Sequence, residues 1–92
     1  MNKPLTKAEL KALDFGHGWL ENWSVLEADD GSEQDYIHVQ RVGWADGMFA
    51  MSDSYATLEN ILKNYNRRGG VRVWLGGIPP TEEQRKAATW DA

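Results

Sequence analysis

Acidic side chains form the densest group of chemically active residues in the chain. Five carboxylates fall within nine residues with no Lys or Arg among them: Glu27, Asp29, Asp30, Glu33 and Asp35. Carboxylates crowded in this way create a local negative field, which attracts a basic partner and speeds its association. We therefore predict an acidic, partner-binding hairpin. Asp and Gly are also common turn residues, so a solvated turn without a binding role is the alternative.

A short basic segment lies further along the chain. Residues 63–76 hold four Lys or Arg and no acid, whereas residues 15–62 hold nine acids and one base. Guanidinium groups bind phosphates and carboxylates, and a tryptophan ring can stack on a nucleotide base. The predicted basic patch, a contact for a partner or for RNA, consists of Arg67, Arg68, Arg72 and Trp74. Alternatively, cations at a helix C-terminus only stabilise the helix dipole, by roughly 0.3–1 kcal/mol each.

Residue patterns that support catalysis or metal binding are absent from the sequence. The chain has no Cys, which excludes disulfides, thiolate zinc sites and a cysteine nucleophile. Its two histidines, His17 and His38, lack the spacing of a metal site. We expect no catalytic residues, no metal, no cofactor and no enzymatic activity. A minor enzyme stays open as an alternative, because serines and aspartates are scattered along the chain.

Length and composition limit the classes to which the protein can belong. Ninety-two residues predict a single domain spanning residues 1–92. The net charge of −4 disfavours direct binding to duplex DNA. The N-terminus does not resemble a signal peptide, and no stretch approaches the roughly 20 apolar residues of a membrane span. We expect a cytoplasmic protein with no membrane partner.

The first half of the chain predicts one helix and three strands. Thr6 and Glu9 have the spacing of a capping box, and Gly16 is a natural helix stop, so we expect a helix at 7–14. Runs rich in β-favouring residues follow at 19–28, 36–44 and 48–51. Turn clusters containing Gly31 and Gly47 separate these runs. The simplest arrangement is a three-stranded antiparallel meander.

The second half predicts two more helices and one more strand. An apolar stripe at helical spacing favours a helix at 54–66, and its members are Leu58, Ile61, Leu62 and Tyr65. Alternating apolar residues predict a half-buried strand at 71–75. Thr81 and Gln84 repeat the capping-box spacing before a short helix at 82–88. The predicted fold is α+β, in the order α-β-β-β-α-β-α, with a four-stranded antiparallel sheet and helices mainly on one face.

Tryptophans are numerous for a chain of this size, and five cannot all be fully buried in so small a core. Alternation places Trp74 on the strand face opposite Val71, Val73 and Leu75. If the helices cover the valine face, Trp74 is exposed or half-exposed, and an exposed Trp is typical of an interface anchor. The alternative is a rim residue that lies over Lys or Arg side chains.

The acidic hairpin from Glu27 to Asp35 and the helix-strand unit from Ser54 to Leu75 occur here in a short, acidic chain without Cys. In these respects the protein resembles small phage-encoded anti-defence proteins of the anti-CRISPR type. The resemblance implies a stoichiometric inhibitor that occupies a basic nucleic-acid-binding surface of a bacterial CRISPR effector complex and blocks target DNA binding. The acidic hairpin would act as a DNA mimic, and the basic segment would contact guide RNA or an acidic patch. A small RNA-associated module is the alternative.

Overall fold

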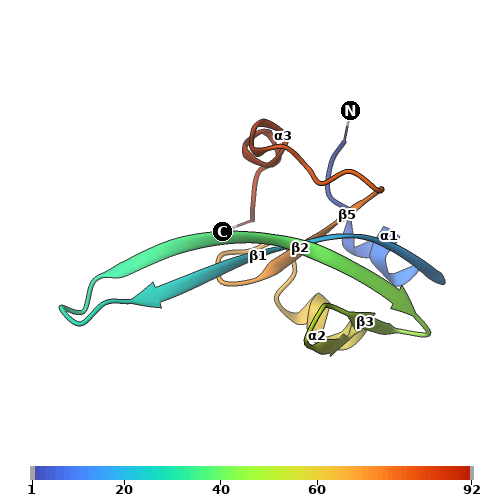
Figure 1. Cartoon of the computed structure of the whole chain (residues 1–92), viewed down its shortest axis with the longest axis horizontal. Coiled ribbons are helices and arrows are strands. Elements are labelled where there is room, and N and C mark those ends of the chain that lie inside the picture. Colours follow the sequence, from blue (N-terminus) through green and yellow to red (C-terminus); the bar gives the residue numbers. More distant parts are fainter. Residues whose placement is uncertain (1, 92) are drawn as a thin grey trace.

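An antiparallel sheet with three short helices makes up the part of the chain that the computed structural model describes, residues 2–91. The five strands of this part are β1 (Phe15–Glu27), β2 (Glu33–Ala45), β3 (Met48–Ala50), β4 (Tyr55–Thr57) and β5 (Val71–Leu75). Their spatial order is β4-β3-β2-β1-β5, and every neighbouring pair is antiparallel. The helices are α1 (Lys7–Lys11), α2 (Leu58–Lys63) and α3 (Glu82–Ala87) (Figure 1). None of them is long and apolar enough to cross a membrane.

Both predicted capping boxes are present. The Thr6 hydroxyl accepts from the Glu9 amide at 3.1 Å, and the Glu9 carboxylate accepts from the Thr6 amide at 2.9 Å. Thr81 and Gln84 form the same reciprocal pair at the start of α3. These bonds satisfy backbone donors that a helix N-terminus otherwise leaves unpaired. The predicted start of α1 is thus confirmed, although the helix ends at Lys11 because the chain turns into β1 at Phe15.

The predicted helix at 54–66 is shorter than expected, and its first residues form a strand instead. Residues 55–57 form β4, which pairs with β3, so the sheet has five strands and not the four predicted from the sequence. Tyr55 and Thr57 favour a strand, and the Thr57 hydroxyl accepts from the Asn60 amide at 3.1 Å. Thr57 therefore caps α2, and the helix begins at Leu58 instead of residue 54.

Strands β1 and β2 form a hairpin that is longer than the rest of the sheet. Each strand has 13 residues, and they pair continuously from Phe15 opposite Ala45 to Glu27 opposite Glu33. Strand β5 pairs only with residues 18–22 of β1, and β3 pairs only with residues 43–45 of β2. Residues 23–37 consequently project from the body of the sheet as a two-stranded ribbon, which we name the arm (Figure 1).

The hydrophobic core lies on the sheet face that α1 and α2 cover. Its buried members are Leu5, Leu10, Leu20, Val42, Trp44, Phe49, Ile61, Tyr65 and Val73. Within this core the Tyr65 hydroxyl donates to the Leu5 carbonyl at 2.7 Å and accepts from the Val73 amide at 3.0 Å. Burial raises the pKa of the Tyr65 hydroxyl to about 12. The buried hydroxyl thus joins the N-terminal segment to β5.

The opposite sheet face is covered as well, by α3 and the segment that follows it. Figure 1 shows α2 and α3 on opposite sides of the β1–β2 ribbon. The expected placement of helices mainly on one face therefore holds for α1 and α2 but not for α3. The prediction that Trp74 is exposed is wrong, since its side chain is 0% exposed. Strand alternation correctly placed Trp74 opposite the valine face, but it could not show that α3 covers that second face.

Candidate functional site: an acidic arm and a tryptophan-lined groove

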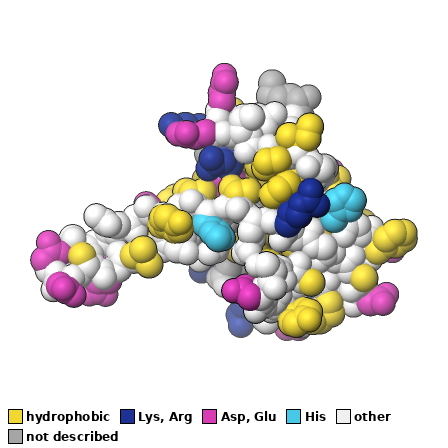
Figure 2. Space-filling view, in the orientation of Figure 1, with side chains coloured by type: hydrophobic (Ala, Val, Ile, Leu, Met, Phe, Trp, Pro, Cys, Tyr) yellow, Lys and Arg dark blue, Asp and Glu magenta, His cyan; other side chains and the backbone are white. Residues whose placement is uncertain are grey.

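The five carboxylates of the predicted acidic hairpin lie together near the end of the arm. All five residues are exposed, and Glu27 pairs directly opposite Glu33 across the two strands. Figure 2 shows acidic side chains gathered at this end of the molecule. The Ser32 hydroxyl and amide both donate to the Asp30 carboxylate, at 2.6 and 2.9 Å, and these bonds lower the pKa of Asp30. The turn is therefore ordered around an ionised carboxylate.

One basic residue, Arg68, contacts the acidic arm. Its Nη2 atom lies 3.0 Å from Asp35 Oδ1 and 3.6 Å from Glu33 Oε2. The hydrogen bond with Asp35 and the two negative charges raise the pKa of Arg68. All three side chains are about half exposed, so solvent screens the pairing and it contributes little to stability. Within residues 2–91, the other three carboxylates form no ion pair with Lys or Arg, and these are Glu27, Asp29 and Asp30.

Large apolar side chains accompany the carboxylates on the arm. Leu26 and Tyr36 are 54% and 55% exposed. The strand register places both on the sheet face of Ser24, which is opposite the face that α3 covers. The arm therefore presents apolar groups beside its acidic tip, with no core beneath them. Apolar surface rimmed by charge is typical of protein interaction sites.

The structure does not bring the four residues of the predicted basic patch together on the surface. Arg68 lies beside the arm, and the exposed Arg67 forms a backbone bridge with Asp91. Arg72 and Trp74 are both 0% exposed, so neither has free surface with which to contact RNA. Among the four, only Arg67 and Arg68 are accessible to a partner.

Arg72 instead forms a buried network with Glu21, which is 1% exposed. Its Nε atom lies 2.5 Å from Glu21 Oε1, and Trp74 Nε1 donates to the same oxygen at 2.8 Å. The guanidinium also donates to the Ala88 and Arg85 carbonyls, each at 2.8 Å. Carbonyls at a helix C-terminus lack partners within the helix, so Arg72 ties the end of α3 to the sheet.

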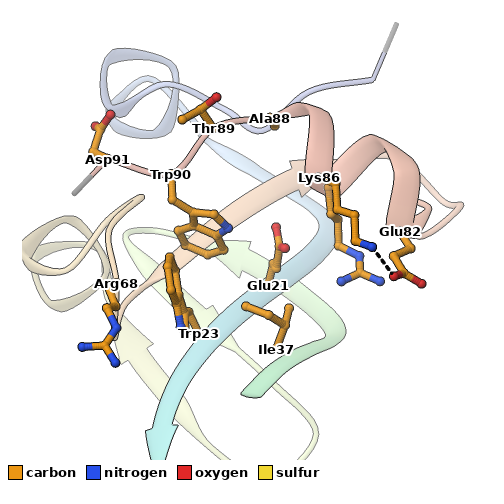
Figure 3. Close-up of a pocket in the computed structure, with 11 residues that line it drawn as sticks. Glu21, Trp23, Ile37, Arg68, Glu82, Lys86, Ala88, Thr89, Trp90 and Asp91 are labelled. Carbon is orange, nitrogen blue, oxygen red and sulfur yellow. Dashed lines mark ion pairs between the residues drawn. The ribbon is translucent and has the colours of Figure 1, made fainter. Parts of the chain in front are cut away.

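A groove of about 840 Å³ lies between the arm and α3 (Figure 3). Trp23, Ile37 and Trp90 form much of its apolar lining, and the two indole rings meet edge to face with centroids 5.1 Å apart. Three cations also line the groove, and these are Arg68, Arg85 and Lys86. The sequence does not predict this site, because Trp90 follows the predicted helix at 82–88 and no local pattern places it against Trp23. The available signal was strand alternation, which places Trp23 on the same face as Trp19 and Val25.

The arm and the groove are the two surfaces of the described residues that could bind a partner or ligand. Among residues 2–91, no group of three or more His, Asp or Glu side chains is placed to hold a metal ion. No protein-family model matches the chain, and comparisons with curated proteins and with solved structures found no match.

Proposed function

We propose that this protein is a non-enzymatic inhibitor that binds a larger complex through its acidic arm. The arm occupies a basic surface that the complex uses to bind nucleic acid, and it thereby blocks that surface. The observation that supports this proposal is the geometry of the arm, which projects beyond the sheet with its five carboxylates exposed. By the resemblance to anti-CRISPR proteins, the partner is a bacterial CRISPR effector ribonucleoprotein and the blocked ligand is its target DNA.

The physical properties of the arm favour a binding role over a solvated turn. A two-stranded ribbon without a core is only marginally stable by itself in water. A short turn would satisfy the chain connection equally well, whereas the observed arm exposes Leu26 and Tyr36 along its length. A partner that covers these side chains gains apolar burial, at about 25 cal/mol per Å². The carboxylates at the tip supply the long-range attraction that steers the encounter.

Arg68 has a positioning role in this proposal. It pairs with Asp35 and Glu33, on the second strand of the arm, and not with Glu27, Asp29 or Asp30. The pairing orients the arm relative to the loop before β5 while the tip keeps its negative charge. The alternative RNA-associated module is less well supported, because Arg72 and Trp74 are buried.

A pull-down with two charge-matched variants tests the proposal. The arm variant combines Asp29→Asn, Asp30→Asn, Glu33→Gln and Asp35→Asn. The control variant removes four exposed carboxylates elsewhere on the chain, through Asp14→Asn, Asp46→Asn, Asp53→Asn and Glu83→Gln. Both variants gain the same net charge, so a general charge effect alters them equally.

Tagged wild type and both variants are incubated with nuclease-treated bacterial lysate, and the bound proteins are identified by mass spectrometry. We expect wild type and control to recover the same nucleic-acid-handling complex, and the arm variant to lose it. Equal recovery by the arm variant contradicts the proposed role of the arm. Recovery that requires intact nucleic acid instead favours an RNA-associated function.

A further inference from the structure

We propose that the groove between the arm and α3 binds a nucleotide, with the base against Trp23 and Trp90 and the phosphate near Arg85 and Lys86. This site lies at the base of the arm, where Trp23 and Ile37 line it, and not at the acidic tip; its occupation does not depend on the inhibitor function. It also differs from the basic patch expected from the sequence, because Arg68 is the one residue that the two sets share.

The shape and lining of the groove fit a planar aromatic group. Its volume of about 840 Å³ falls within the roughly 300–1,000 Å³ of small-molecule pockets. Trp23 and Trp90 present indole rings to it from β1 and from the segment after α3 (Figure 3). The guanidinium of Arg72 lies 4.0 Å from the centre of the Trp90 ring and holds that ring in place. Stacking on aromatic side chains accepts any base, because every base has a π-face.

Two residues that line the groove hold buried donors without a partner, which is compatible with a ligand that carries acceptors but is not specific to the groove, because Trp19 Nε1 and Trp44 Nε1 lack partners as well. Trp23 Nε1 and Arg85 Nε are buried atoms for which the structure shows no hydrogen-bond partner, and both groups only donate. Arg85 also forms no ion pair with a carboxylate among residues 2–91. Because the two atoms are covered, a ligand oxygen reaches them only after the half-buried Arg85 or Trp90 side chain moves.

The charges around the groove favour an anionic group at one end. Lys86 pairs with Glu82 at 2.9 Å, but both side chains are about 70% exposed, so a phosphate can exchange for the carboxylate at little cost. The buried carboxylate of Glu21 is already neutralised by Arg72. Asp91 lies at the Trp90 end of the lining, which leaves the α3 side with Arg85 and Lys86 as the place for phosphate.

The nucleotide has two sources with the same chemistry, a free mononucleotide or one residue of single-stranded RNA. The test uses GMP and a six-nucleotide single-stranded RNA as probes. Each is titrated into ¹⁵N-labelled full-length protein while the indole N–H signals are recorded. We expect saturable shifts of the Trp23 and Trp90 signals, with the Trp44 signal unchanged because that ring lies in the opposite core. If GMP and the RNA bind with similar affinity, the ligand is a free nucleotide. If the RNA binds at least about tenfold more tightly than GMP, the ligand is single-stranded RNA.

Arg85→Gln removes the charge but retains the backbone carbonyl that accepts from Arg72, so this contact between α3 and the sheet is kept. We expect this variant to bind the preferred probe about tenfold more weakly. Arg67→Gln removes an exposed arginine that does not line the groove and should leave affinity within about twofold. Absence of Trp23 and Trp90 shifts with both probes overturns the proposal, and so does an equal effect of the two variants. A tip variant, Asp29→Asn/Asp30→Asn, leaves the pairing of Arg68 with Asp35 and Glu33 intact and is expected to retain this binding, which separates the two proposed functions.

Discussion

The guanidinium of Arg72 lies directly against the carboxylate of Glu21, with 2.5 Å between Nε and Oε1 and with neither side chain more than 1% exposed. The two residues are opposite one another on β5 and β1. Removing two charges from water costs several kcal/mol each, and only close pairing with further hydrogen bonds offsets that cost. Here Trp74 and the carbonyls at the end of α3 supply those bonds, so one ion pair joins the sheet to the helix that borders the groove.

Arg72→Met is expected to destabilise the protein by about 3–5 kcal/mol, because it leaves the Glu21 carboxylate buried without its counter-charge. The double variant Glu21→Leu/Arg72→Met removes both charges and should be more stable than the single variant. Urea unfolding of both proteins measures the difference. A single variant that loses less than about 1 kcal/mol would show that the pair is not important for stability.

Trp90→Ala is expected to loosen α3, since no residue of that helix is itself buried. The substitution removes the ring that stacks on Arg72 and meets Trp23 edge to face. We expect a loss of about 1–2 kcal/mol in stability and faster hydrogen exchange at the Arg85 and Ala88 amides. Trp90→Phe retains an aromatic ring and should lie between wild type and the alanine variant. Unchanged exchange in α3 after Trp90→Ala contradicts this role.

Tyr65 predicts a decline in stability at alkaline pH. Its hydroxyl has a pKa near 10 in the unfolded chain and about 12 in the folded protein, so the folded state holds the proton more tightly. Its contribution is complete below pH 10 and is lost as pH rises from about 10 to 12, at about 1.4 kcal/mol per pKa unit. Tyr65→Phe should remove this part of the decline, and Tyr36→Phe, at an exposed position, should retain it. Unfolding free energies of the three proteins, measured across this pH range, test the prediction. An equally steep decline in Tyr65→Phe would contradict it.

Two glycine substitutions test the close contact between β1 and β5. A Cβ atom at Gly18 would overlap the backbone carbonyl of Trp74, whereas a Cβ at Gly77 meets no atom within 4 Å. Gly18→Ala is expected to cost about 1–3 kcal/mol, because the two strands must separate to accommodate it. Gly77→Ala should be neutral or stabilise slightly through the unfolded chain. Thermal unfolding compares the two, and equal midpoints contradict the predicted contact.

The helix starts and the last strand could be predicted from the sequence, because they depend on interactions between neighbouring residues. The capping boxes at Thr6 and Thr81 are present, and the predicted strand at 71–75 has the observed bounds. The predicted α+β class with an antiparallel sheet is also confirmed. Tyr55 and Thr57 were assigned to a helix because the apolar stripe from Leu58 was extended backwards past its cap.

The candidate site depends on contacts between distant residues, which alternation within one strand cannot reveal. Glu21 and Arg72 are 51 positions apart, and their pairing follows from the register of β1 against β5. A charged residue in a strand is usually exposed, so Arg72 was assigned to a surface patch. The acidic cluster was easier to place because all five carboxylates lie within one hairpin.

The most direct test of the central claim is the salt dependence of binding to the complex captured with wild type. Affinity is measured at several salt concentrations for wild type, the arm variant and the charge-matched control. We predict that affinity falls steeply with salt for wild type and control, whereas the arm variant binds weakly with a shallow dependence, because its screened attraction has been removed. Equal affinity and equal salt dependence in all three proteins would contradict the claim that the acidic arm binds a basic surface.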